Sequence, residues 1–349
     1  TKTAKYLFYR VNFSNYNSIF IDACKTDISK LNTSMVTNMR SMFEYTEGFD
    51  RPLNGWDVSS VTDMKNMFMD SDFNQPIGEW DVSSVTNMNT MFGRTPFNQS
   101  IGGWNVSSVT NMNSMFYNSV FNRPIGGWDV SRVTSMSGMF DSSQFNQSIG
   151  GWDVSSVTSM TVMFAGSQFD QSIGEWDVSS VLYMISMFSS SKFNQPIGKW
   201  NVSSVTDMQR MFMDSDFNQP IGEWNVSSVT NMNIMFKNSQ FNQPIDEWVD
   251  HLSESVSMDD MFSGVATKPC WYDSSESKFQ HCSPPPPPSS PPPPFYPVYK
   301  VGSSDGTDFL AQNCFNEHRN SGENCQTCIS RFQSYMEETK TAKYLFYRV

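Results

Sequence analysis

The chain has 349 residues with a formal net charge of −12, and only 17% of its residues are charged. This acidic balance, without a cluster of Lys and Arg, excludes nucleic-acid binding and disfavours an anionic membrane surface. No stretch approaches the roughly 18 apolar residues of a membrane span, so no membrane-spanning segment is expected.

The N-terminal segment carries a peptide that recurs at the other end of the chain. Residues 1–11 and 339–349 both read TKTAKYLFYRV. One explanation is that the chain is one unit of a tandem array with a 338-residue period. The other is that a single short peptide is used at both ends. The first explanation predicts that residues 339–349 begin the next unit, and that residues 1–30 form an N-terminal cap belonging to a junction between units.

The central two thirds of the chain repeat every 24 residues. Nine tryptophans mark the period: Trp56, Trp80, Trp104, Trp128, Trp152, Trp176, Trp200, Trp224 and Trp248. A fixed period of 20–50 residues with constant apolar positions is typical of stacked repeats. The sequence therefore predicts a β-solenoid of about ten 24-residue coils over residues 31–265.

Each coil has three predicted parts. W-D-V alternates, which predicts a half-buried strand with Trp and Val inward and Asp outward. M-x-x-M-F has the spacing of one helical or 3₁₀ turn. F-N-Q-P-I is predicted to be extended, because its Pro cannot continue a helix.

A turn residue follows F-N-Q-P-I, and we expect it to adopt a left-handed conformation in every coil. Gly is the residue that reaches positive φ without strain, and Asn and Asp tolerate it best among the others. The nine positions are Asn54, Gly78, Gly102, Gly126, Gly150, Gly174, Gly198, Gly222 and Asp246.

Two parts of the repeat region depart from the pattern. The end coils are irregular, with Leu31 in place of Trp and an insertion after Trp248, as expected for capping repeats. Leu182 and Tyr183 replace the usual Thr-Asn or Thr-Asp pair. This apolar and aromatic pair is a candidate contact point on one face.

The motifs W-D-V-S-S-V-T-N-M-N-T-M-F and F-N-Q-P-I-G-E-W resemble the BspA-like, leucine-rich-repeat-related surface protein family over about residues 31–263. The resemblance implies a secreted or surface-displayed β-solenoid, often linked to adhesion. It supplies no catalytic residues. The Pro-rich and Cys-rich tail is not part of the family's pattern.

Residues 266–298 are predicted to form a disulfide loop and a polyproline II spacer. The run SPPPPPSSPPPP favours polyproline II, which serves as a semi-rigid linker. Its composition also resembles hydroxyproline-rich glycoproteins of algal and plant walls. That reading makes these prolines candidate sites of hydroxylation and O-glycosylation: Pro284, Pro285, Pro286, Pro287, Pro288, Pro291, Pro292, Pro293 and Pro294.

The cysteines all lie outside the regular coils, at Cys24, Cys270, Cys282, Cys314, Cys325 and Cys328. Six cysteines favour disulfides and an extracellular compartment. We expect a local Cys270–Cys282 bridge. Cys24 is a whole solenoid away from the tail, so we expect it to pair with a tail cysteine of a preceding unit, with the other two tail cysteines joined. Residues 299–338 would then form most of a small Cys-rich α+β junction module.

Other chemistry is weaker. Cys325-x-x-Cys328 with His318 and Cys314 is compatible with zinc, but no second C-x-x-C accompanies it. The Met ladder is better explained as core than as a copper(I) site. The aspartates after Trp (57, 81, 129, 153 and 177) fit a solvated row better than a calcium ladder. No catalytic motif, cofactor or metal is predicted, so the protein is not expected to be an enzyme.

N-glycosylation sequons begin at Asn12, Asn32, Asn98, Asn105, Asn146, Asn201 and Asn225. Asn105, Asn201 and Asn225 are favoured because they replace the outward Asp after Trp. Asn98 and Asn146 are accessible only if that Asn faces outward.

We therefore expect a structural repeat unit of an extracellular glycoprotein fibre or surface appendage, at the cell surface or shed from it. Its partners would be copies of itself, joined end to end through Cys-rich junctions, and covalently attached glycans. The alternative is a surface adhesin whose solenoid face binds a host protein or glycan.

Overall fold

A computed structural model describes residues 28–266, 268–269, 272–273 and 278–279. The chain divides into two units between Ser283 and Pro284, and all the described residues belong to the first. The expected Pro-rich spacer, the Cys-rich module and both copies of the terminal peptide lie outside the described residues. So do Asn12, all six cysteines and the nine candidate prolines.

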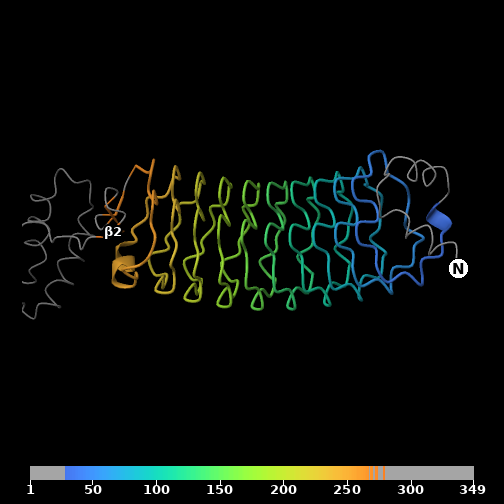
Figure 1. The fold of residues 1–349 in the computed structure, drawn as a ribbon, viewed down its shortest axis with the longest axis horizontal. Coiled ribbons are helices and arrows are strands. Elements are labelled where there is room, and N and C mark those ends of the chain that lie inside the picture. The colour runs from blue at the N-terminus through green and yellow to red at the C-terminus, as the bar shows by residue number, and fades with distance from the viewer. Residues whose placement is uncertain (1–27, 267, 270–271, 274–277, 280–349) are drawn as a thin grey trace, which may run out of the picture. The chain divides into compact units, whose positions relative to one another are not determined.

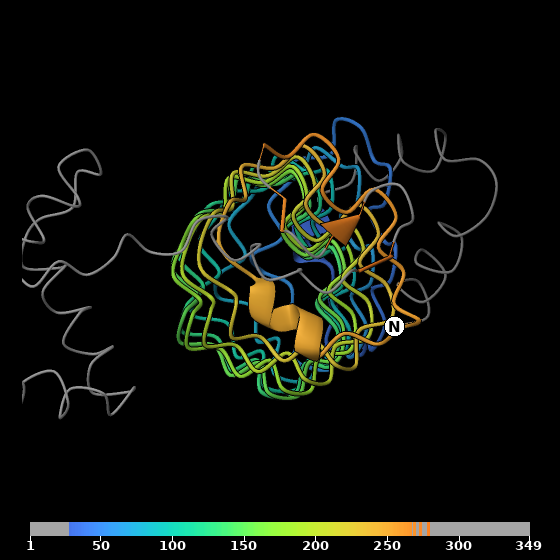
Figure 2. The ribbon, with the colours of Figure 1, turned by 90° about the vertical axis from the view of Figure 1, so that its left-hand side faces the viewer.

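The described residues form a series of coils stacked along one axis (Figure 1), and Figure 2 looks along that axis. Named elements occur only near the two ends of this series. They are the 3₁₀ helix η1 (Ile28–Lys30), the 3₁₀ helix η2 (Asp246–Asp250), and the strands β1 (Tyr272–Asp273) and β2 (Lys278–Phe279). The two strands pair antiparallel, with Tyr272 opposite Phe279.

The strand expected at W-D-V is absent from the described coils. Adjacent coils are joined instead by single parallel bridges, from Asn38↔Asp63 to Asn231↔Ser257, at the position that follows Thr in the regular repeat. The predicted burial of W-D-V is nevertheless correct: Trp56 and Val58 are buried and Asp57 is exposed. Three residues can alternate inward and outward without forming a hydrogen-bonded strand. The alternation of W-D-V therefore predicts burial but does not distinguish a strand from an irregular extended segment.

The M-x-x-M-F segment forms turns, but they are not helical. Met67 N–H donates to the Met64 carbonyl (3.1 Å), and Ser71 N–H donates to the Phe68 carbonyl (3.2 Å). The third residue of each turn has a positive φ, 56° at Asn66 and 53° at Asp70. A positive φ at that position is typical of a type II turn rather than of a 3₁₀ turn.

The expected left-handed conformation after F-N-Q-P-I is wrong at all nine positions, since none of those residues has a positive φ. Glycine is needed there for a different reason. A Cβ added to Gly126 would lie 2.6 Å from the Ser148 carbonyl oxygen of the next coil, and the other six glycines give 2.6–3.0 Å. Glycine is required because two coils approach closely at this position. At Asp246 no further 24-residue coil follows, so a side chain fits there.

The core is continuous through the stack. In every regular coil the Trp, both Val, both Met, both Phe and the Ile are buried. Equivalent rings stack on one another: the centroids of Phe68 and Phe92 are 5.7 Å apart, and those of Trp128 and Trp152 are 6.5 Å apart. Each indole N–H also donates to the preceding coil, as Trp104 does to the Ile77 carbonyl (3.1 Å). One coil therefore cannot bury its core without its neighbours.

Both ends of this core are covered. The Ile28 carbonyl of η1 accepts the Trp56 indole N–H (2.9 Å). At the other end, Tyr272 of β1 meets the Phe262 ring edge-on at 4.9 Å, and its hydroxyl donates to the Met258 carbonyl (3.2 Å). The irregular first and last coils are thus caps, as their sequences indicate.

Candidate functional site

Among the described residues, no group of three or more His, Cys, Asp or Glu side chains is placed to hold a metal ion. No helix among them is both long enough and apolar enough to cross a membrane. The candidate surfaces are therefore the long faces of the stack and its two ends.

One face carries the row of residues that follow Trp. Asp57 accepts hydrogen bonds from the Ser59 hydroxyl (2.6 Å) and the Ser59 N–H (3.1 Å). The hydroxyl bond first and the N–H bond second hold the pKa of Asp57 below its ordinary value, and the same two bonds act in the coils of Asp81, Asp129 and Asp177. Each carboxylate is therefore satisfied within its own turn.

The sequons divide into two structural groups. Asn32, Asn105, Asn201 and Asn225 are exposed. Each lies in the same kind of turn as the aspartates, and the Asn105 side-chain oxygen accepts the Ser107 hydroxyl (2.7 Å). Glycosylation at these four positions stays a prediction, and their exposure is compatible with it.

Asn98 and Asn146 are half-buried and belong to a ladder that sequence reasoning missed. The side-chain oxygen of the Asn in F-N-Q accepts the backbone N–H of the equivalent residue one coil later. Asn98 accepts from Asn122 (3.1 Å), and Asn146 accepts from Asp170 (3.0 Å). The sequence signal was the constancy of this Asn, with Asp as its only substitute at positions 50 and 170.

The residue that bridges adjacent coils is polar in every coil except the one that contains Tyr183, which follows Leu182. Leu182 and Tyr183 are 37% and 44% exposed. In the next coil, the Asp207 carboxylate accepts the Gln209 N–H (2.9 Å). The Tyr183 side chain has no oxygen at the position of the Asp207 carboxylate. Among the described residues, the Ile185 N–H therefore has no acceptor. An apolar patch here thus adjoins an open backbone donor.

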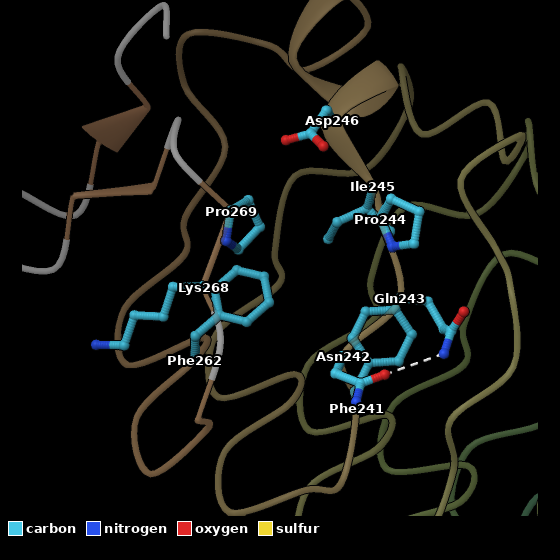
Figure 3. Close-up of a pocket in the computed structure, with 9 residues that line it drawn as sticks. All are labelled: Phe241, Asn242, Gln243, Pro244, Ile245, Asp246, Phe262, Lys268 and Pro269. Atoms are coloured by element: carbon cyan, nitrogen blue, oxygen red, sulfur yellow. Dashed lines mark hydrogen bonds between the residues drawn. The ribbon is translucent and has the colours of Figure 1, made fainter. Parts of the chain in front are cut away.

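The C-terminal end of the stack holds a cavity of about 370 Å³ (Figure 3). It is lined on one side by residues 241–246 and on the other by Phe262, Lys268 and Pro269. It lies against the last F-N-Q-P-I segment, which no further F-N-Q-P-I segment covers. Asn242 is accordingly exposed, and its side-chain oxygen accepts only the Gln243 side-chain amide (3.0 Å) within the described chain.

These observations define a repeat protein whose unit is a 24-residue coil. The chain belongs to the family described as "Mycoplasma protein of unknown function, DUF285", whose model matches residues 11–120, 73–173, 117–192 and 165–270. The family match agrees with the expected BspA-like surface-repeat family. It does not test a relation to leucine-rich repeats or the likeness of the tail to hydroxyproline-rich glycoproteins. No curated protein and no solved structure matched the chain.

Proposed function

We propose that the chain is a structural unit of an extracellular glycoprotein fibre or surface appendage, built on a β-solenoid. The observation that carries this proposal is the unbroken core. The same eight side chains fill each regular coil, and ring stacks on ring from Phe43 to Phe262. Interiors packed in this way resist compression, which suits a spacer.

The surface is consistent with that role. The polar side chains that follow Trp and those of the F-N-Q ladder form hydrogen bonds within the stack. Asn105, Asn201 and Asn225 are exposed and are the proposed glycan sites. In this proposal, disulfide-linked segments and the Pro-rich segment, which lie outside the described residues, connect successive units.

Electron microscopy of native material, combined with intact-mass analysis, tests the proposal. We expect filaments built from a repeating stack and a mass per unit above the 39.7 kDa of the polypeptide. Isolated 39.7 kDa monomers without attached sugar contradict it.

The alternative function is adhesion, and Leu182 and Tyr183 favour it. The test is the double variant Leu182→Thr with Tyr183→Asn, which restores the pair found at Thr86 and Asn87. An adhesin that uses this patch loses binding to host cells or a glycan array while its melting temperature is unchanged. Equal binding by the variant and the parent contradicts this use of the patch.

A further inference from the structure

Backbone hydrogen bonds between coils have a fixed direction. In the segment after each bridge, alternate N–H groups donate forward to the next coil. Thus Ile234 N–H donates to the Asp259 carbonyl and Asn238 N–H to the Ser263 carbonyl, both at 2.8 Å. The residue just before the bridge donates backward instead, as Thr230 N–H does to the Thr206 carbonyl (2.9 Å). A stack with this polarity leaves different groups open at its two ends.

At the C-terminal end, the forward donors have no next coil. Asp260 and Gly264 occupy the positions of Ile234 and Asn238 and are exposed. Their N–H groups have no acceptor in the part of the chain that the structure describes. The Val256 carbonyl, equivalent to that of Thr230, likewise has no donor there.

At the N-terminal end, the complementary groups have no partners among the described residues. The carbonyls of Arg40 and Glu44 occupy the positions of the Asp259 and Ser263 carbonyls. They accept no hydrogen bond from described residues, and the backward-donating N–H of Thr37 has no acceptor among them. An unpaired backbone edge of this kind is a template for another chain.

The two edges also have the same backbone shape. At the C-terminal edge φ is 56° at Asp260 and 77° at Gly264. At the N-terminal edge φ is 54° at Ser41 and 57° at Tyr45, the residues that follow Arg40 and Glu44. An ordinary extended strand lacks this alternation of left-handed residues. The segment that matches each edge is therefore another copy of this repeat.

We propose that the C-terminal edge of one stack pairs with the N-terminal edge of a second copy of the chain. In this joint, Asp260 and Gly264 N–H donate to the Arg40 and Glu44 carbonyls of the second copy. The Thr37 N–H of the second copy donates in return to the Val256 carbonyl. The contact is head-to-tail, so it leaves one open edge at each end of a dimer and propagates as a filament.

This inference rests on the proposed fibre and specifies one of its joints. The joint uses Asp260 and Gly264 on the outer rim of the last coil and leaves out Met258 and Phe262, because the Tyr272 hydroxyl already meets the Met258 carbonyl and its ring covers Phe262. Aromatic stacking therefore stops at the joint. Backbone hydrogen bonds and rim side chains hold it.

Side chains at the joint can be designed from pairs inside the stack. Lys237 Nζ lies 3.3 Å from Asp260 Oδ2, 23 residues later. Ser263 and Ser41 occupy the positions of Lys237 and Asp260, one at each end of the stack. Ser263→Lys with Ser41→Asp therefore recreates this pair across the joint, and Ser263→Lys with Ser41→Lys places two like charges there. Asp260 has the same φ as Ser41 within a few degrees, so the Asp variant fits its backbone.

The experiment measures self-association of the full 349-residue chain by sedimentation velocity and negative-stain microscopy at increasing concentration and two salt concentrations. One double variant gains an exposed ion pair and the other gains a like-charge repulsion of similar size, so we expect their association constants to differ by about twofold to thirtyfold at low salt, with the Lys–Asp variant tighter. Added salt should narrow this difference. Met213→Lys, which places the same charge at the equivalent position inside the stack, should leave association unchanged.

The outcomes separate the joint from the fibre. If filaments form and both double variants associate equally tightly, edge pairing is wrong and the proposed fibre is still supported. Monomers at every concentration in the parent and in the Lys–Asp variant overturn both. If the chain's own terminal segments cover the edges, the protein should stay monomeric at every concentration. That result therefore counts against the joint.

Discussion

At the residue scale, the glycine after F-N-Q-P-I determines how closely two coils approach. An Ala at Gly126 places its Cβ 2.6 Å from a backbone oxygen of the next coil, whereas an Ala at the adjacent Gly127 meets nothing within 4 Å. We expect Gly126→Ala to lower the free energy of unfolding by about 1–3 kcal/mol, since backbone atoms must move. Gly127→Ala is the matched control and should be neutral or slightly stabilising. Urea denaturation of both variants measures the difference, and equal stabilities contradict the close-approach explanation.

The aspartate row makes the fold sensitive to acid. The pKa values of Asp57, Asp81, Asp129 and Asp177 are lowered from 3.8, chiefly by the hydroxyl of the Ser two residues later. A group with a lowered pKa in the folded state stabilises it above its unfolded pKa, and this contribution is lost as pH falls through the folded pKa. The melting temperature should therefore fall as pH is lowered from about 5 to about 3.

One carboxylate opposes this trend. Burial raises the pKa of Asp141, so its carboxylate opposes folding, and this unfavourable contribution is relieved as pH falls. The role of the aspartate row in this acid sensitivity is tested with a variant that has Asn at positions 57, 81, 129 and 177. The variant is produced in a host without N-glycosylation. Asn105 already makes the same turn contacts, so the variant should fold normally at neutral pH. A slope of melting temperature against pH as steep as the parent's disproves the role of this row.

At the element scale, the F-N-Q ladder joins adjacent coils through side-chain oxygens, in addition to the backbone bridges. The Asn218 side-chain oxygen accepts the Asn242 N–H (3.0 Å) and the Gln243 side-chain amide (3.1 Å). Asn218→Ala leaves both donors without this acceptor and should cost about 1–3 kcal/mol. Asn218→Asp keeps an acceptor, as Asp170 does for Asn194 (2.9 Å), and should cost less. Thermal unfolding compares the two, and an Asp variant as unstable as the Ala variant rules out this acceptor role.

The turns of the M-x-x-M-F segment store strain in some coils. Val162 has φ 50° and Ile234 has φ 62°, although both are β-branched. The left-handed region costs such residues about 1–2 kcal/mol, and Asn tolerates it best after Gly. Val162→Asn, which copies Asn66, should therefore raise the free energy of unfolding by about 1 kcal/mol. The control is Val157→Asn, a fully buried core position with an ordinary φ, which should be strongly destabilised. A destabilised Val162→Asn contradicts the strain argument.

At the scale of the whole stack, the repeat makes stability depend on register. The contacts between coils recur at fixed spacings: the Asn ladder joins residues 24 positions apart, and each Trp N–H bond joins residues 27 positions apart. Deleting the 24 residues 129–152 rejoins Trp128 to Asp153 and should give a shorter stack with one cooperative transition. Deleting only residues 129–140 puts core positions out of register and should abolish cooperative unfolding. Calorimetry decides between them, and similar traces for the two deletions refute register dependence.

The sequence alone determined the repeat, its 24-residue period and the side chains that form the core. Trp, Val, Met, Phe and Ile recur at fixed positions, and burial of apolar side chains needs no knowledge of what lies beside them. The irregular composition of the first and last coils likewise identified the two caps. The exposure of Asn105, Asn201 and Asn225 followed from the alternation of W-D-V.

The tertiary structure decided how neighbouring coils meet. The glycine conformation, the type of turn in M-x-x-M-F, the Asn ladder at Asn98 and Asn146, and the open donors at Asp260 and Gly264 all depend on the neighbouring coil, whose contacting atoms lie 22 to 25 residues away in the regular coils. A sequence pattern shows which face a side chain occupies. The hydrogen-bond partner across the gap between coils is set by the distance and direction of the neighbouring backbone, and only the folded stack specifies these.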